Sequence, residues 1–434
     1  MQFFISRYQK TYMSSKPKQK HDFVALLLLF LVIWSAGGAN EYQQLLYSTN
    51  GNIIFSAVII LVCVYLLKNQ NKPLLPNKLF FLLAFLFVWG SLGTLISSLP
   101  KNYFYIIYNS FIAYTLIVLL KEKVFFYYEK YVTILSLISL VVYFVVIIDP
   151  NIGAIMKSIS IIKGGPTMES NFLFVGIAPI DPTNAIIFPR RNVGFAWEAG
   201  RFAAIVVVAI YINLIINHFK IKGNKNLLIL FITLITTQST TGYFSLLIPI
   251  LTYLNNVKKK YLVIPISIVL TFCYISLSFM SDKIDKTINW QENQSVSFDD
   301  QMNYYSRIGS AYVPQRAEGL YYDFLNFIHD PIFGYGPKYE NSYVNTVLYP
   351  GAKIYASDGA LQVLASCGII VGLFFYSLLF LSSQRLATIY KYRGKWMLLF
   401  MFILINISYN FWFITIYLTF ILYAFLTPAP QKNI

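Results

Sequence analysis

Long apolar runs separated by short polar segments dominate this chain. About 20 apolar residues are needed for a helix to cross the hydrocarbon core of a bilayer. Uninterrupted runs of roughly this length occupy residues 23–38, 52–67, 79–98, 103–120, 131–148, 202–217, 261–279 and 360–381. Two more, 227–254 and 396–427, are interrupted by polar residues, and we interpret each as two short spans that turn at the interruption. The pattern predicts an all-α polytopic membrane protein with about 12 transmembrane helices.

Two long polar stretches divide this series of spans. The predicted organisation is transmembrane helices 1–5 over residues 1–148, a first long external loop over 149–201, helices 6–9 over 202–279, a second long external loop over 280–356, and helices 10–12 over 357–434. The functional groups of such a protein are expected in the two loops, because ionisable side chains are costly inside a bilayer.

Composition and charge agree with this organisation. Only 12% of the residues are charged, whereas soluble domains average about 25%. The segments on the N-terminal side of the predicted membrane hold 22 of the 34 Lys and Arg but 3 of the 18 Asp and Glu. This asymmetry places both termini in the cytoplasm. The net charge of +16 is therefore expected to face anionic membrane lipid, and no nucleic-acid partner is expected.

The second external loop contains a predicted amphipathic helix. Pro314 suits the first turn of a helix and Pro331 stops one. Between them, at about 315–329, one stripe at helical spacing comprises Leu320, Tyr321, Phe324, Leu325 and Ile328. Such a helix is expected to lie on the membrane surface or to cover a cavity. Arg316 lies at its start and is a candidate catalytic residue, although an arginine that binds lipid headgroups has the same pattern.

The end of the first external loop concentrates charge in a chain where charge is scarce. Phe188–Ala203 reads FPRRNVGFAWEAGRFA and holds Arg190, Arg191, Arg201 and Glu198. Guanidinium groups bind phosphate oxygens in pairs, and the N-terminus of the following helix also favours anions. The stretch predicts a binding site for a diphosphate, with lipid-headgroup anchoring as the alternative. Glu198 is expected to act either as a general base or as a brace for the arginines.

Other polar residues give weaker signals. Ser239 and Thr240 lie in the interruption of the run 227–254, where hydroxyl groups bind phosphate oxygens or satisfy a helix break. His329 is the only one of three histidines on the predicted external side and is a candidate catalytic residue. Arg307 and Tyr335 complete the candidates for substrate binding. Cys63, Cys273 and Cys367 all lie in apolar runs, so neither a disulfide framework nor a metal site is expected.

Four segments, in order, resemble the motifs of the O-antigen polymerases and O-antigen ligases. RRNVGFAWEAGRFA resembles the element R-x-x-G-x-x-x-E-P/A-G-x-x-A, and TTQSTTGYFSLL is similar to the hydroxyl-rich element that follows two spans of that family. QRAEGLYYDFLNFIHDPIFGYG is similar to the element with an arginine, an aromatic residue and a P-l-x-G-x-G turn. SDGALQVLASCGIIVGLFFY resembles the element that begins H/S-N/D and ends G-I-I-G. Together they cover about residues 188–380.

The resemblance implies a C-type glycosyltransferase-like membrane fold in a bacterial cytoplasmic (inner) membrane, with a metal-independent active site on the external face and no cofactor. The implied donor is a glycan on undecaprenyl diphosphate, and a chain-length-regulating co-polymerase is an implied partner. A sugar hydroxyl of the acceptor attacks the anomeric carbon and the lipid diphosphate leaves. By the match, Arg191, Arg201 and Arg316 hold the diphosphate, with Arg190 as the alternative to Arg191, and Glu198 is the family's acid.

One departure from the family pattern bears on the reaction. Ligases of the family carry a His-Asn pair where this chain has Ser357 and Asp358. Asp358 is a candidate for supplying a carboxylate there or for capping the following helix. The missing histidine favours a polymerase of oligosaccharide repeat units, for an O-antigen or a similar surface polysaccharide. The alternatives are a ligase-type transferase and a flippase or transporter of lipid-linked oligosaccharide.

Overall fold

The computed structural model describes most of the chain, and everything below concerns those residues. They are 20–38, 49–97, 101, 103–160, 162–165, 168–172, 174–180, 190–258, 261, 311–312, 314, 316–336, 338–350, 353–355 and 359–428. The predicted span 261–279, apart from its first residue, and the candidate residues Arg307 and Asp358 lie outside them.

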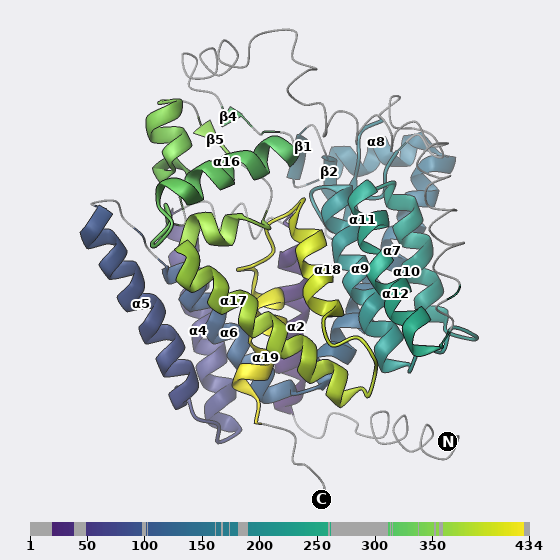
Figure 1. Cartoon of the computed structure of the whole chain (residues 1–434). Coiled ribbons are helices and arrows are strands. Elements are labelled where there is room, and N and C mark those ends of the chain that lie inside the picture. Colours follow the sequence, from purple (N-terminus) through teal and green to yellow (C-terminus); the bar gives the residue numbers. More distant parts are fainter. Residues whose placement is uncertain are drawn as a thin grey trace, which may run out of the picture.

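Apolar helices form the body of the molecule (Figure 1). They are α2 (Lys20–Ala36), α4 (Thr49–Asn69), α5 (Asn77–Ser97), α6 (Phe104–Leu120), α7 (Lys123–Ile148), α9 (Ala199–Ile216), α10 (Lys225–Thr237), α11 (Thr240–Ser245), α12 (Leu247–Asn256), α17 (Gln362–Ile389), α18 (Met397–Asn406) and α19 (Thr415–Leu426). Among the described residues, α5, α7, α9 and α17 are long and apolar enough to cross a membrane. This confirms a mostly helical polytopic membrane protein, while the total of 12 spans stays a prediction.

Helix α9 is the most enclosed of the four long helices, because 89% of its 18 residues are buried. It packs against α7, α10, α11 and α12. Each residue from Phe202 to Val208 is at most 1% exposed. A helix that is apolar all round is stable only when it is surrounded on every side. Glu198 is the N-cap residue of α9 and Arg201 lies in its first turn, so the most enclosed of the long helices positions these charges.

The interrupted run 227–254 forms two helical arms, as the polar residues predicted. Helix α10 ends at Thr237, Gln238 takes a left-handed conformation (φ 47°), and α11 begins at Thr240. The turn lies near Arg190, whose carbonyl accepts a hydrogen bond from the Gln238 side chain (3.1 Å). At the far end of the second arm, the Asn256 side chain donates to the Arg393 carbonyl (2.9 Å).

Helix α7 corrects one predicted boundary. The fifth span was expected at 131–148, but the helix begins at Lys123. Glu129, predicted in a basic loop, is therefore part of the helix and is 4% exposed. Its carboxylate accepts hydrogen bonds from Asn213 (2.7 Å) and Asn226 (3.1 Å). Buried carboxylates need such donors, and these bonds connect α7 to α9 and α10.

Both predicted external loops contain secondary structure. The first holds α8 (Pro150–Ile159) and an antiparallel sheet of β1 (Ile162–Gly165), β2 (Met168–Phe172) and β3 (Val175–Ile177), in the order β1-β2-β3. The second holds α16 (Arg316–His329), the short parallel pair β4 (Ala311–Tyr312) and β5 (Lys353–Ile354), the 3₁₀-helix η2 (Tyr339–Asn341) and the π-helix η3 (Val344–Leu348). Helix α16 lies across the end of the body, with one end close to α17 (Figure 1).

The segment 330–336 fastens α16 to a kink in α17. Gly368 interrupts the helix with a φ of 76°, and a side chain there would collide with the Ile332 carbonyl. The kink frees backbone groups, which bond to the segment: the Tyr335 and Gly336 amides donate to the Ala365 and Ser366 carbonyls, both at 2.9 Å. The end of α16 and the upper part of α17 therefore form one connected unit.

Candidate active site

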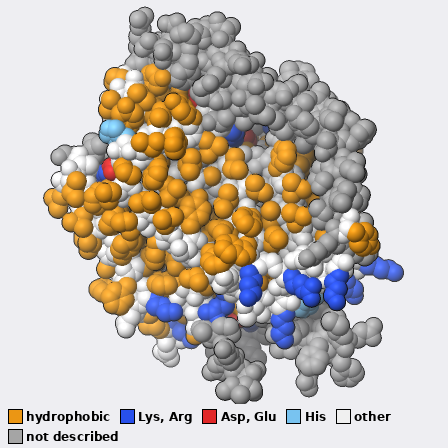
Figure 2. Space-filling model, viewed as in Figure 1, with side chains coloured by type: hydrophobic (Ala, Val, Ile, Leu, Met, Phe, Trp, Pro, Cys, Tyr) orange, Lys and Arg blue, Asp and Glu red, His pale blue; other side chains and the backbone are white. Residues whose placement is uncertain are grey.

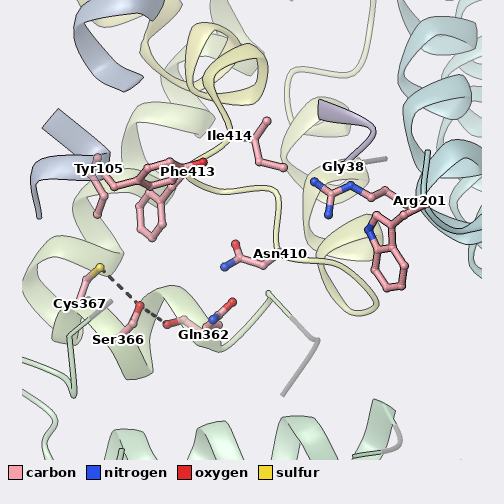
Figure 3. A pocket seen from close by; sticks show the side chains of 11 residues that line it. Gly38, Tyr105, Arg201, Gln362, Ser366, Cys367, Asn410, Phe413 and Ile414 are labelled. Atoms are coloured by element: carbon pink, nitrogen blue, oxygen red, sulfur yellow. Dashed lines mark hydrogen bonds between the residues drawn. The ribbon is translucent and has the colours of Figure 1, made fainter. Parts of the chain in front are cut away.

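A cavity of about 500 Å³ lies where the first turn of α9 meets α6, α17 and the loop between α18 and α19 (Figure 3). Polar lining residues are Arg201, Gln362, Ser366 and Asn410, and the apolar ones include Tyr105, Ile106, Phe413 and Ile414. Figure 3 shows the Arg201 side chain directed into this space. A cavity with a cationic group and an apolar wall suits a ligand with an anionic and an apolar part.

Two contacts hold Arg201 at the cavity. Its Nε donates to the Ala36 carbonyl (2.8 Å). The guanidinium carbon lies 5.5 Å from the centre of the Phe411 ring, within the range of a cation–π contact. These contacts orient the guanidinium plane, which is what recognition of phosphate oxygens requires.

Glu198, Arg316 and Tyr409 form a cluster beside this arginine. The Tyr409 hydroxyl donates to Glu198 Oε1 (2.9 Å), and Arg316 Nη2 lies 3.7 Å from the same oxygen. The Arg316 guanidinium also lies 5.0 Å from the centre of the Tyr409 ring. The arginine side chain is 30% exposed and the carboxylate side chain 17%, so a ligand can reach both.

The electrostatics of Tyr409 show how charges converge on this cluster. Burial, and then the neighbouring Glu198 carboxylate, raise the pKa of the Tyr409 hydroxyl above its usual range, while Arg316 and Arg191 act in the opposite direction. The hydroxyl therefore stays protonated and donates to Glu198. Arg191 and Arg316, from the two different predicted external loops, thus act on one group.

The sequence left open which of Arg190 and Arg191 faces the ligand, and their contacts differ. Arg190 Nη1 bonds to Glu169 Oε2 (2.5 Å) and to the Ala178 carbonyl (2.7 Å), so it fastens the small sheet to the body. Arg191 Nε donates to the Thr237 carbonyl (3.1 Å). The contacts favour Arg191 as the ligand-facing residue. Between the two arginines and α9, buried Asn192 anchors the loop through Thr236 (2.9 Å between backbone atoms).

The hydroxyl-rich turn has a structural explanation. Ser239 caps α11 by accepting a hydrogen bond from the Gly242 amide (3.3 Å) and is 2% exposed. Thr240, the first residue of α11, is partly exposed. Satisfying a helix break accounts for Ser239, and a substrate contact by either residue stays a prediction.

The remaining candidates lie at the other end of α16. His329 is exposed and stacks on Tyr343 with ring centroids 4.2 Å apart. A 14-residue helix is about 20 Å long, so His329 is far from the Arg316 cluster and cannot act on the same atoms. Tyr335 is 3% exposed and belongs to the segment bonded to α17. Substrate binding by Tyr335 stays a prediction.

Sequence reasoning missed Tyr409. The polar residues Asn406, Ser408 and Asn410 identified a turn in an apolar run but gave no reason to select the tyrosine. Gly200 is a second missed residue, because a side chain there would collide with the Tyr409 hydroxyl. The motif A-G-R after Glu198 was a usable signal, since glycine in a first helical turn permits close approach. No group of three His, Cys, Asp or Glu that could hold a metal occurs among the described residues.

Comparison with protein families gives a match for one segment. Residues 225–376 match the family model described as O-antigen ligase. Over this segment the chain resembles the O-antigen ligase/polymerase family, which supports an assignment to it. The matched segment covers about a third of the chain and runs from α10 into α17, so it includes Arg316. Glu198, Arg201 and Tyr409 lie outside it. Comparisons with curated proteins and with solved structures found no match.

Proposed function

We propose that this protein is a member of the O-antigen ligase/polymerase family and polymerises oligosaccharide repeat units carried on undecaprenyl diphosphate, on the external face of a bacterial cytoplasmic membrane. Members of the family are glycosyl-transferring enzymes that act on lipid-linked glycans. Figure 2 supports the proposed orientation, because Lys and Arg gather at the end of the visible face opposite α16. The positive-inside rule assigns that end to the cytoplasm.

The observation that carries the proposal is the loose contact between Arg316 and Glu198 beside the cavity lined by Arg201. At 3.7 Å the pair is longer than a charge-assisted hydrogen bond, which is typically about 2.7–2.9 Å. The Arg316 side chain is 30% exposed and a guanidinium carries five N–H donors, so an anionic ligand can reach it. A diphosphate placed between Arg201 and Arg316 would receive positive charge from both external loops, as a departing anion requires.

The reaction assigned to this site is a single displacement. The oxygen of an acceptor sugar hydroxyl forms a bond to the anomeric carbon of the donor glycan. The bond from that carbon to the diphosphate oxygen breaks, and its electron pair leaves with undecaprenyl diphosphate. The acceptor proton passes to a base, for which Glu198 is the carboxylate next to the proposed diphosphate. Attack opposite the leaving group inverts the anomeric centre.

The arrangement also explains a role for Tyr409. Its hydroxyl occupies one oxygen of Glu198 (2.9 Å) and its ring supports the Arg316 guanidinium. One side chain thus positions both the proposed base and the proposed cation. Tyr409 is a positioning residue in this proposal, because it acts through its two neighbours.

Replacing Arg316 by Ala tests the proposal in cells. We expect single repeat units to accumulate on the lipid carrier, seen on a gel of surface and lipid-linked polysaccharide. The matched control is Arg393→Ala, which removes an arginine at the other end of the molecule and should leave the chain-length distribution unchanged. Normal long chains from a stably expressed Arg201→Ala/Arg316→Ala variant would contradict the assignment.

The description of the matched family favours a second candidate, a ligase-type transferase. The two activities leave different products when the site is disabled. Loss of a ligase leaves long chains on undecaprenyl diphosphate, whereas loss of a polymerase leaves chains one unit long. The gel of the Arg316→Ala strain therefore also decides between these candidates.

A further inference from the structure

Helix α16 has an unusual distribution of side chains. Its outer stripe, defined as Tyr321, Phe324 and Ile328 together with Ile332 just after the helix, is apolar and exposed by 45%, 47%, 56% and 51%. Tyr321, Phe324 and Ile328 follow helical spacing and share one face of α16, and Ile332 lies in the turn that follows the helix. In water, a contiguous exposed apolar surface is unfavourable and marks a contact with another apolar phase.

The opposite face of α16 is polar and buried. Glu318 and Asp323 are both 0% exposed, and Asn326 is 3% exposed. Glu318 accepts hydrogen bonds from the hydroxyl groups of Tyr312 (2.8 Å) and Tyr322 (3.1 Å). The helix is therefore oriented opposite to a helix on a water-exposed surface, which buries its apolar side.

Directional bonds fix this orientation. The Asn326 side chain accepts a hydrogen bond from the Val344 amide (3.0 Å), which connects the inner face to η3. Rotating α16 to bury the outer stripe would break these bonds and leave buried polar groups without partners, at a cost that folded proteins avoid. The stripe consequently faces outward as a built feature of the fold.

The outer stripe is continuous with the apolar surface of the proposed spans. The Ile369 amide donates to the Pro331 carbonyl (2.8 Å), which joins the turn that carries Ile332 to α17. The exposed side chains of α17 include Ile370 (47%) and Leu373 (53%). On the other side, Phe333 packs on Trp89 of α5 with ring centroids 4.8 Å apart. Figure 2 shows hydrophobic side chains over α16 and over the helices below it on the same face.

We propose that α16 is seated in the outer leaflet of the membrane, with the outer stripe in contact with lipid acyl chains. Helices of this kind lie about 5–10 Å into the boundary between headgroups and acyl chains. A second part of this proposal rests on the proposed function: the position of α16 in the leaflet holds Arg316 at the depth of the lipid headgroups. The diphosphate of a lipid-linked donor lies at that depth, because its isoprenoid part occupies the hydrocarbon.

Spin labelling measures whether α16 contacts lipid acyl chains, and it needs no substrate. A nitroxide label is placed at Phe324→Cys, at Leu373→Cys on α17 and at Glu340→Cys in η2, each in a background with Cys63, Cys273 and Cys367 replaced by Ala. The protein is reconstituted in vesicles of phosphatidylethanolamine and phosphatidylglycerol. Collisions with oxygen, which concentrates in acyl chains, are compared with collisions with a water-soluble nickel chelate. Glu340 is exposed on the same external unit and is the matched water-facing control.

We expect the label at Phe324 to resemble the label at Leu373, with oxygen favoured over the nickel chelate, and the label at Glu340 to show the opposite. A label at Phe324 that collides with the nickel chelate as often as the label at Glu340 overturns the proposal. Exclusion of both reagents at Phe324 also overturns it, because a protein surface would then cover the stripe. Failure of the proposed function leaves these collision rates unchanged, so the two proposals fail separately.

A photoreactive residue keeps the test independent of the cysteine-free background. A benzophenone amino acid at Phe324 should form adducts with phospholipid that mass spectrometry detects, and the same amino acid at Glu340 should form fewer. Equal lipid capture at the two positions would contradict this position of α16 in the leaflet.

Discussion

Two cation–carboxylate pairs join distant parts of this protein, and they are built differently. Lys101, between α5 and α6, bonds to both the Asp330 carboxylate and the Gly334 carbonyl, and its side chain is 1% exposed. Arg316 and Glu198 are 3.7 Å apart and partly exposed. A buried cation with two short bonds holds distant segments together, whereas a longer, partly exposed pair beside a cavity is accessible to a ligand.

We call Lys101–Asp330 the closed pair and Arg316–Glu198 the open pair. The closed pair determines where the open pair lies. Asp330 directly follows α16, and the segment it begins is bonded to α17. Lys101 therefore fixes one end of α16, and Arg316 is at the other. The glycines opposite Lys101 fit this role, because a side chain at Gly90 would approach the Lys101 carbonyl within 2.7 Å.

The largest expected effect follows from breaking the closed pair. Lys101→Met leaves the Asp330 carboxylate without its buried cation. Removing one partner of a fully buried pair costs about 3–5 kcal/mol, and the 29% exposure of Asp330 places this pair below that range. We expect a large drop in the thermal unfolding midpoint of the purified protein and in its amount in the membrane. Lys338→Met, at an exposed position of the same external unit, should change both by little. Equal unfolding midpoints for the two variants would show that the closed pair does not stabilise the fold.

The next largest effect concerns the support of the open pair. Gly200→Ala should displace Tyr409 from Glu198, because the added methyl group collides with the tyrosine hydroxyl. A displacement of about 1 Å at an active site reduces a rate by about 100-fold. We expect polymer formation to fall by roughly that factor, measured as long-chain product per cell, with protein levels unchanged.

Tyr409→Phe supplies the control for that variant, because it removes the colliding oxygen. It deletes the hydrogen bond to Glu198, a charged-group bond worth about 1.5–3 kcal/mol, so its own effect is expected to be at most comparable to that of Gly200→Ala. In a Gly200→Ala background, Tyr409→Phe should cost nothing further and should restore part of the activity. Strictly additive losses in the double variant would contradict the collision.

The smallest expected effect concerns Glu169, which forms partly exposed ion pairs with both Arg190 and Lys157. Partial burial acts to raise the pKa of the Glu169 carboxyl, but hydrogen bonds from Lys157 and Arg190 outweigh it and lower the pKa. Its contribution to stability is therefore present above the unfolded-state pKa and is lost as the pH falls through the lowered folded-state pKa. Pairs of this exposure contribute about 0–1 kcal/mol.

Glu169→Gln should remove this acid-dependent part. The unfolding midpoint of the variant, measured between neutral pH and the usual carboxyl range, should fall less on acidification than that of the wild type. Polymer length should stay normal, because the proposed ligand-binding arginines are elsewhere. Short chains from this variant would give Arg190 a direct role at the site.

The sequence predicted the helical body and the charged stretch at α9 because apolar runs and clustered arginines are local signals. It also predicted α16 from the spacing of its apolar residues and its two flanking prolines. It could not place those residues on the exposed side, because periodicity identifies a stripe but not the surface that the stripe contacts. The buried carboxylates Glu318 and Asp323 gave no such signal, since burial depends on partners distant in the chain.

The remaining parts of the site depend on contacts across long separations in sequence. Tyr409 meets Glu198 over 211 positions, and Lys101 meets Asp330 over 229. No local pattern encodes such pairs. The sequence could not decide between Arg190 and Arg191 for the same reason. The partner of Arg190 is Glu169, which belongs to a small sheet that the sequence did not predict.

Binding of undecaprenyl diphosphate to the purified protein tests the central claim most directly, namely that Arg316 in the open pair binds the diphosphate. Affinities are measured by native mass spectrometry for the wild type, Arg316→Ala and Arg393→Ala. We predict that Arg316→Ala weakens binding at least about tenfold, which corresponds to about 1.4 kcal/mol, while Arg393→Ala binds like the wild type. Equal affinity of Arg316→Ala and the wild type would contradict the account.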